Sequence, residues 1–181
     1  MDPVNAKGYT IAGWIGVALM LGAVVALGIM GKWLGLLLSL IFLVASVAFM
    51  SFRRQVPSLF DLLFVIAALA NGAGWIWELY TQVFGYDEVV HAYTSFAISL
   101  WLGFLVFYSM REEFRGRSLI FGLAIATMGL AAGAVWEMIE YTFIQLKDPV
   151  EDLMVDGVGA VLAGLFATWV LKRELREGHS A

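Results

Sequence analysis

Acidic side chains gather in residues 132–159, a stretch flanked by strongly apolar sequence. The acidic residues of this stretch are Glu137, Glu140, Asp148, Glu151, Asp152 and Asp156, and the only basic residue among them is Lys147. A carboxylate near the centre of a membrane helix costs about 2.5–3.5 kcal/mol, so such acids usually face a partner or a cavity. Converging carboxylates also repel one another, and protonation, water or a bound cation must relieve that repulsion. A divalent cation would satisfy most of these groups at once.

Residues 73–91, which precede this stretch, supply further candidate ligands, including one of the chain's 2 histidines. The predicted metal ligands are Glu78, Asp87, His91, Glu137 and Asp156, and the predicted bases or outer-shell groups are Glu140 and Asp152. Carboxylate oxygens with one imidazole suit Zn, Mn, Mg or non-haem Fe, whereas a chain with Cys 0 offers no thiolate for Cu(I). Glu88 and His91 have the Glu-x-x-His spacing of carboxylate di-iron bundles. The later stretch offers only Glu137-x-x-Glu140, so the di-iron pattern is incomplete.

Structural roles could also account for several of these residues. Glu78 and Glu137, each after a tryptophan, could be neutral acids that hydrogen-bond neighbouring helices in register. His91 could be a satisfied polar residue at a helix interface. These alternatives leave the metal hypothesis open.

Helix capping is the leading interpretation for at least one of Asp87 and Asp152, because each begins a predicted helix where an acid is favoured. Asp156 lies one turn after Asp152 and is not explained as a cap. Glycines such as Gly157, Gly159 and Gly164 are predicted to allow close helix packing.

Composition shows which elements must hold these residues. The chain has 181 residues, 61% of them hydrophobic, and 14% are charged, with a mean hydropathy of +0.85. These values lie outside the range of soluble domains and predict an integral membrane protein. The fold class predicted is all-α, with six transmembrane helices, each about long enough to cross a hydrocarbon core. The predicted helices cover residues 9–30, 33–52, 58–84, 87–110, 118–146 and 151–171.

Domain organisation follows from these spans. We expect a single transmembrane domain over residues 1–181, with an N-terminal hairpin (1–56), two hairpins that carry the site (57–171) and a polar tail (172–181). The first apolar run is longer than a typical signal-peptide core, so it is expected to remain as a helix.

The charge distribution predicts the orientation. With both termini in the cytoplasm, nine of the 11 basic residues lie inside and only Lys32 and Lys147 lie outside. The same orientation places nine of the 15 acidic residues in the outer half or the outer loops. We therefore expect a multi-pass inner-membrane protein with an outward-facing site. The short arginine clusters are explained by topology, and no nucleic-acid partner is expected.

An internal repeat is the second organisational feature. Residues 73–84 and 132–143 both match AGxxWExxxxxF, and each copy precedes a helix with two polar residues four apart. These pairs are Asp87 with His91 and Asp152 with Asp156. The pattern predicts that helices 3–4 and 5–6 are parallel copies of one hairpin, as in some transporters. Pseudo-twofold packing would bring the two polar sets together.

A family resemblance appears at these same residues. Its carriers are Tyr86-Asp87-x-x-x-His91, Trp136-Glu137-x-x-Glu140-Tyr141 and Asp148-x-x-x-Asp152-Leu153-Met154 with the glycines that follow. The chain resembles the bacterial YjdF-like inner-membrane family and, more distantly, VanZ-like proteins. Tyr141 stands where the family usually has tryptophan, and Asp156 stands where VanZ-like proteins tend to have asparagine. The resemblance implies a six-helix membrane fold and brings no established reaction.

Three classes of function fit the sequence. An enzyme would use one or two divalent metal ions to hydrolyse or transfer a group on a lipid-like substrate. A transporter or channel would use the same acids as a cation or proton path. The inner halves of the last three helices carry few polar residues, which disfavours such a path. An assembly subunit would use its acidic face to bind a basic partner. The lipid bilayer is the expected environment, and a homo-oligomer is left open.

Overall fold

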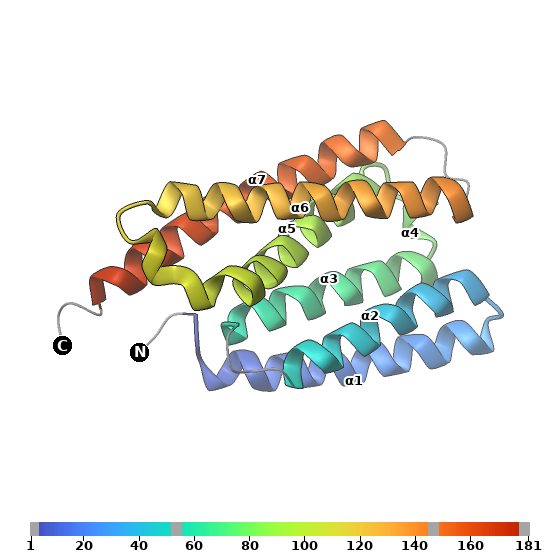
Figure 1. Ribbon diagram of the computed structural model, residues 1–181. Helices are drawn as coiled ribbons and strands as arrows, with labels where there is room; N and C mark the ends of the chain where they lie inside the picture. The colour runs from blue at the N-terminus through green and yellow to red at the C-terminus, as the bar shows by residue number, and fades with distance from the viewer. Residues whose placement is uncertain (1–3, 52–55, 145–148, 178–181) are drawn as a thin grey trace. The chain divides into compact units, whose positions relative to one another are not determined.

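The computed structural model describes residues 4–51, 56–144 and 149–177, and the regular structure in those ranges is helical (Figure 1). It contains 6 helices long and apolar enough to cross a membrane. The predicted all-α class and the six membrane helices are therefore confirmed. The chain forms two compact units, Met1–Val90 and His91–Ala181. The predicted division at residues 56 and 171, the orientation of the termini and the internal repeat stay predictions.

The first unit is a group of three packed helices and one short helix. They are α1 (Lys7–Ile29), α2 (Trp33–Ser51), α3 (Ser58–Ile76) and α4 (Leu79–Gln82). The first three pack on one another side by side (Figure 1). Gly31 adopts a φ of 69° between α1 and α2, a left-handed conformation that glycine reaches without steric cost. The predicted tight α1–α2 hairpin is thus confirmed.

The break between α3 and α4 differs from the prediction of one helix over residues 58–84. The α3 helix ends at Ile76, and Glu78 follows with φ 57° and ψ 32°, which is left-handed. Lys32 Nζ donates hydrogen bonds to the main-chain oxygens of Trp75 (3.0 Å) and Ile76 (3.2 Å). In a continuous helix those two carbonyl oxygens would accept from N–H groups four residues later. The lysine takes their place, so the helix can end where the apolar pattern alone predicted continuation.

The second unit contains most of α5 and the whole of α6 and α7. Its elements are α5 (Tyr86–Phe107, which begins in the first unit), the 3-10 turn η1 (Tyr108–Phe114), α6 (Ser118–Ile139), the π-helical turn η2 (Glu140–Ile144) and α7 (Pro149–Glu177). The helix predicted to run to residue 110 tightens into η1 after Phe107. The helix predicted to run to residue 146 changes to η2 after Ile139, and its last predicted residues lie outside the described ranges.

Small residues bring α6 and α7 (yellow to red in Figure 1) into close contact. A Cβ added to Gly164 would clash with the main-chain oxygen of Gly122, and the reverse also holds. One turn further along α7, Thr168 Oγ1 donates to the main-chain oxygen of Ser118 across the helix pair (3.2 Å). The predicted role of Gly164 in close helix packing is confirmed.

Candidate functional site

His91, Glu137 and Asp156 form the centre of the candidate site, within the second unit. His91 comes from α5, Glu137 from α6 and Asp156 from α7. His91 Nδ1 lies 3.7 Å from Glu137 Oε1 and 3.5 Å from Asp156 Oδ1. One ligand atom from each residue lies within 4.8 Å of the other two. The structure therefore brings together three of the residues that the sequence predicted as metal ligands.

These three side chains are largely buried. The exposed fraction is 6% for each of the Glu137 and Asp156 side chains and 14% for His91. Glu137 Oε1 is buried and accepts no hydrogen bond within the part of the chain that the structure describes. A buried carboxylate oxygen without such a bond is costly unless a charge compensates it. A cationic partner would therefore stabilise the buried carboxylate of Glu137.

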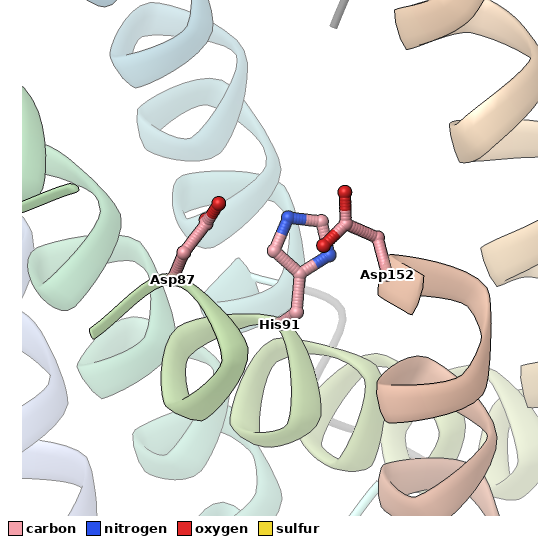
Figure 2. A group of neighbouring side chains, drawn as sticks. All are labelled: Asp87, His91 and Asp152. Carbon is pink, nitrogen blue, oxygen red and sulfur yellow. The ribbon is translucent and has the colours of Figure 1, made fainter. Parts of the chain in front are cut away.

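Two further acids surround this centre. Asp152 lies one turn before Asp156 on α7, and its side chain and that of His91 have ligand atoms within 4.8 Å (Figure 2). Glu140 is buried at the first residue of η2. The charges of Glu140, Asp152, Asp156 and His91 all act on Glu137. The two predicted bases are thus near the buried centre, and Asp152 is the more accessible one because it is only half-buried.

Asp87 occupies the first turn of α5, one turn before His91 (Figure 2). Its place in the first turn suits an acid, because the positive end of the helix macrodipole lies there. Asp152 has the corresponding place in the first turn of α7. A capping role and a ligand role remain compatible with these positions.

Glu78 has a different environment, in the first unit. Its Oε1 accepts a hydrogen bond of 2.9 Å from Lys32 Nζ, and its side chain is 59% exposed. This hydrogen bond and the lysine charge lower the pKa of Glu78 below its ordinary value of 4.5. Glu78 follows the end of α3, whereas the sequence predicted that it lies inside a helix over residues 58–84. Its role as a metal ligand stays a prediction.

Close contacts between α5 and α7 hold His91 and Asp156 at this separation. Ser95 Oγ donates a hydrogen bond of 2.9 Å to the main-chain oxygen of Asp156. A Cβ on Gly159 would clash with the main-chain oxygen of Ala92, so the two helices approach closely there. The predicted packing role of Gly159 is therefore confirmed. The sequence pattern alone does not single out Ser95, although its position four residues after His91 places both on one helix face.

Gly133 performs a similar function on α6. A Cβ at this position would lie 2.9 Å from Asp156 Oδ2 and 3.2 Å from Asp156 Cβ. The absence of a side chain gives the carboxylate room to lie against α6, beside Glu137 one turn later. In the sequence, Gly133 stands out only as part of the repeated pattern, because spacing alone cannot reveal what packs against a glycine.

The separations between these atoms limit what can stabilise them. Direct N–H···O hydrogen bonds span about 2.7–3.2 Å, and the two distances from His91 are longer. A tetrahedral cation about 2.1 Å from each ligand atom would place such atoms roughly 3.4 Å apart. The donor set of one imidazole and several carboxylates suits Zn, Mn or Fe better than a soft metal. The residues present therefore fit a divalent cation.

Comparison with known proteins assigns a family. Residues 9–173 match the family model described as predicted membrane protein (DUF2238). The chain belongs to this family, and the predicted YjdF-like resemblance is confirmed. The more distant resemblance to VanZ-like proteins has no support. No match to the chain was found among curated proteins or among solved structures.

Proposed function

We propose that this membrane protein binds a divalent cation at His91, Glu137 and Asp156, and uses it in hydrolysis or group transfer on a lipid-like substrate. The observation that carries the proposal is the buried Oε1 of Glu137, which lies 3.7 Å from His91 Nδ1 and accepts no hydrogen bond among the described residues. A cation between these groups would compensate the charge of Glu137 and Asp156 together. Asp87 and Glu78 are proposed as additional ligands on the sequence pattern.

Asp152 and Glu140 supply the remaining chemistry in this proposal. A bound divalent cation would act as a Lewis acid that polarises a water molecule or an ester oxygen. Asp152, half-buried at the start of α7, is the proposed base that accepts a proton from the attacking water. Glu140 is the alternative base, and its charge acts on Glu137 in either case. The lipid-like substrate class is proposed because the site lies in helices able to cross a membrane.

Transport of a cation or proton is the second candidate. The buried hydroxyls of α5 and α7 in the second unit argue against a polar path along the helices. Ser95, Ser99 and Thr168 each donate to a main-chain oxygen, at 2.9, 2.6 and 2.8 Å. Hydroxyl groups committed to the backbone are poorly placed to pass an ion from one site to the next. A site confined to one end of the helices, which the charge pattern predicts to be the outer side of the inner membrane, fits these contacts better.

Metal analysis of the full chain, purified in detergent, tests the proposal. The native protein is expected to hold a stoichiometric divalent metal, identified by mass spectrometry. His91→Ala, Glu137→Gln and Asp156→Asn are each expected to weaken metal affinity by on the order of 100-fold, since even outer-shell changes cost 10–100-fold. Glu113→Gln is the matched control, because Glu113 is an exposed acid of η1 in the same unit.

Two results would contradict the proposal. One is a native protein that takes up no metal from Zn, Mn, Mg or Fe and whose thermal unfolding does not respond to chelation. The other is metal uptake that Glu137→Gln and Glu113→Gln change equally. Release of inorganic phosphate from a lipid phosphomonoester such as phosphatidic acid, measured for the native protein and for Asp152→Asn at equal metal content, then separates catalysis from binding alone.

A further inference from the structure

A cluster of basic side chains marks the other end of the second unit. Its members are Arg111 and Arg115 in η1, Arg117 just before α6, and Lys172 and Arg173 near the end of α7. The hydrogen bond between Thr168 Oγ1 and the Ser118 main-chain oxygen (3.2 Å) joins the two helix ends at one level. Arg117 directly precedes Ser118, and Lys172 follows Thr168 by one turn. The two cations therefore lie at the same end of the α6–α7 pair.

Internal contacts engage some of these cations more than others. Arg115 pairs with Glu112 through Nη2 and Oε2 at 2.6 Å. The Arg111 guanidinium lies 4.4 Å from the centre of the Tyr108 ring, and its Nη1 donates to the Tyr108 main-chain oxygen. Arg117 and Lys172 are exposed on the helix ends. These two side chains are consequently the best placed to meet an external anion.

The surroundings of Arg117 and Lys172 are apolar and exposed. Leu119 and Ile120, which follow Arg117, are 60% and 52% exposed. Leu165 and Trp169, which precede Lys172, are 59% and 49% exposed. Arg173 also lies 5.8 Å from the centre of the Trp169 ring. Exposed apolar side chains next to a cation are the arrangement found where a helix passes from acyl chains into headgroups.

We infer that this end of the α6–α7 pair, with Arg117 and Lys172 at its centre, binds the anionic headgroups of membrane phospholipids. Basic positions between membrane helices near the headgroup level recognise such lipids. The phosphate would meet Arg117 and Lys172, while the acyl chains would cover Leu119, Ile120 and Leu165. A soluble polyanion would satisfy the cations alone and leave the adjacent apolar side chains exposed. The inference is independent of the proposed metal site, which uses none of these residues.

Nanodiscs containing the full chain provide the test. Phosphatidylglycerol is expected to raise the thermal unfolding temperature above that in phosphatidylcholine with the same acyl chains. Native mass spectrometry of the protein with mixed lipids measures the preference directly. Arg117→Gln combined with Lys172→Gln is expected to weaken phosphatidylglycerol binding by on the order of tenfold or more, because each basic residue near the surface contributes. High salt should weaken the preference in the native protein.

Control variants and one soluble anion decide the outcome. Arg117→Lys with Lys172→Arg keeps both charges and should keep the lipid preference, and Lys7→Gln removes one exposed charge from the first unit and should also keep it. Equal binding of both lipids by the native protein would overturn the inference. So would an unchanged preference in the double glutamine variant. Stabilisation by inorganic phosphate to the same extent as by phosphatidylglycerol would assign the cations to a soluble anion and likewise overturn it.

Discussion

Residues 73–84 and residues 132–143 share the pattern AGxxWExxxxxF, and the glycine of each pattern lies beneath another side chain. In the first region, a Cβ on Gly74 would clash with the ring of Tyr80, which folds back from α4. In the second region, a Cβ on Gly133 would press on the carboxylate of Asp156 from α7. The same glycine position therefore makes room for an aromatic ring after α3 in one region and for a carboxylate of the candidate site in the other.

The glutamates of the two patterns differ more than the glycines. Glu78 lies beyond the end of α3, is 59% exposed and pairs with Lys32 at 2.9 Å. Glu137 lies inside α6, is 6% exposed and faces His91 at 3.7 Å. The lysine both compensates Glu78 and takes up the carbonyl oxygens that end α3. Partners distant in sequence thus determine whether this pattern ends a helix or buries an acid.

The largest effect is expected from Gly74→Ala. The added methyl group meets three ring atoms of Tyr80, whose hydroxyl donates to Asn71 Oδ1 at 3.0 Å and so resists displacement. Overpacking of this kind costs about 1–3 kcal/mol, and a rigid ring places the expected loss near the upper value. Thermal unfolding of the detergent-purified protein measures the loss against Gly22→Ala, which has nothing within 4 Å of the added Cβ. Equal stability of the two variants would show that Tyr80 does not require this glycine.

A smaller effect, of a different kind, is expected from Gly133→Ala. The added methyl group would lie 2.9 Å from Asp156 Oδ2, which can rotate away, and 3.2 Å from Asp156 Cβ, which moves only with the backbone of α7. The loss of thermal stability should therefore be smaller than that of Gly74→Ala. If the proposed metal site is correct, the displaced carboxylate should weaken metal affinity by about tenfold, within the range found for outer-shell changes. Metal titration measures this against Gly157→Ala, whose Cβ would lie 3.3 Å from the flexible Leu130 Cδ2. Equal metal affinity in the two variants would remove Gly133 from the site.

The sequence was sufficient for the features that depend on local composition. Apolar runs of about 20 residues predict membrane helices, because backbone groups in lipid must be satisfied within the helix. The turn at Gly31 was equally predictable, since only a short polar interruption separates two apolar runs. In the site, the spacing of Asp152 and Asp156 and the presence of His91 indicated which residues to consider.

Features that depend on distant partners could not be predicted. At the end of α3, the Ile76 carbonyl oxygen accepts a hydrogen bond from Lys32, which lies 44 residues earlier. The separation of His91 from Asp156 depends on Gly159 and Ser95, whose partners lie on another helix. The π-helical turn at Glu140 has no reliable sequence signal, although such turns often occur at functional sites.

The smallest expected effect is the pH-dependent contribution of Glu78 to the stability of the fold. Lys32 holds the pKa of Glu78 below its ordinary value of 4.5, so the folded state favours the ionised acid. The pair therefore stabilises the fold fully at pH values above 4.5, and this contribution is lost as the pH falls through the lowered pKa. Exposure makes the contribution small. We expect Glu78→Gln to unfold at a lower temperature than the native protein at pH 7, with a difference that shrinks in acid. In a Lys32→Met background the same substitution should have no pH-dependent effect, and a difference that persists there would show that Lys32 is not the partner that stabilises Glu78.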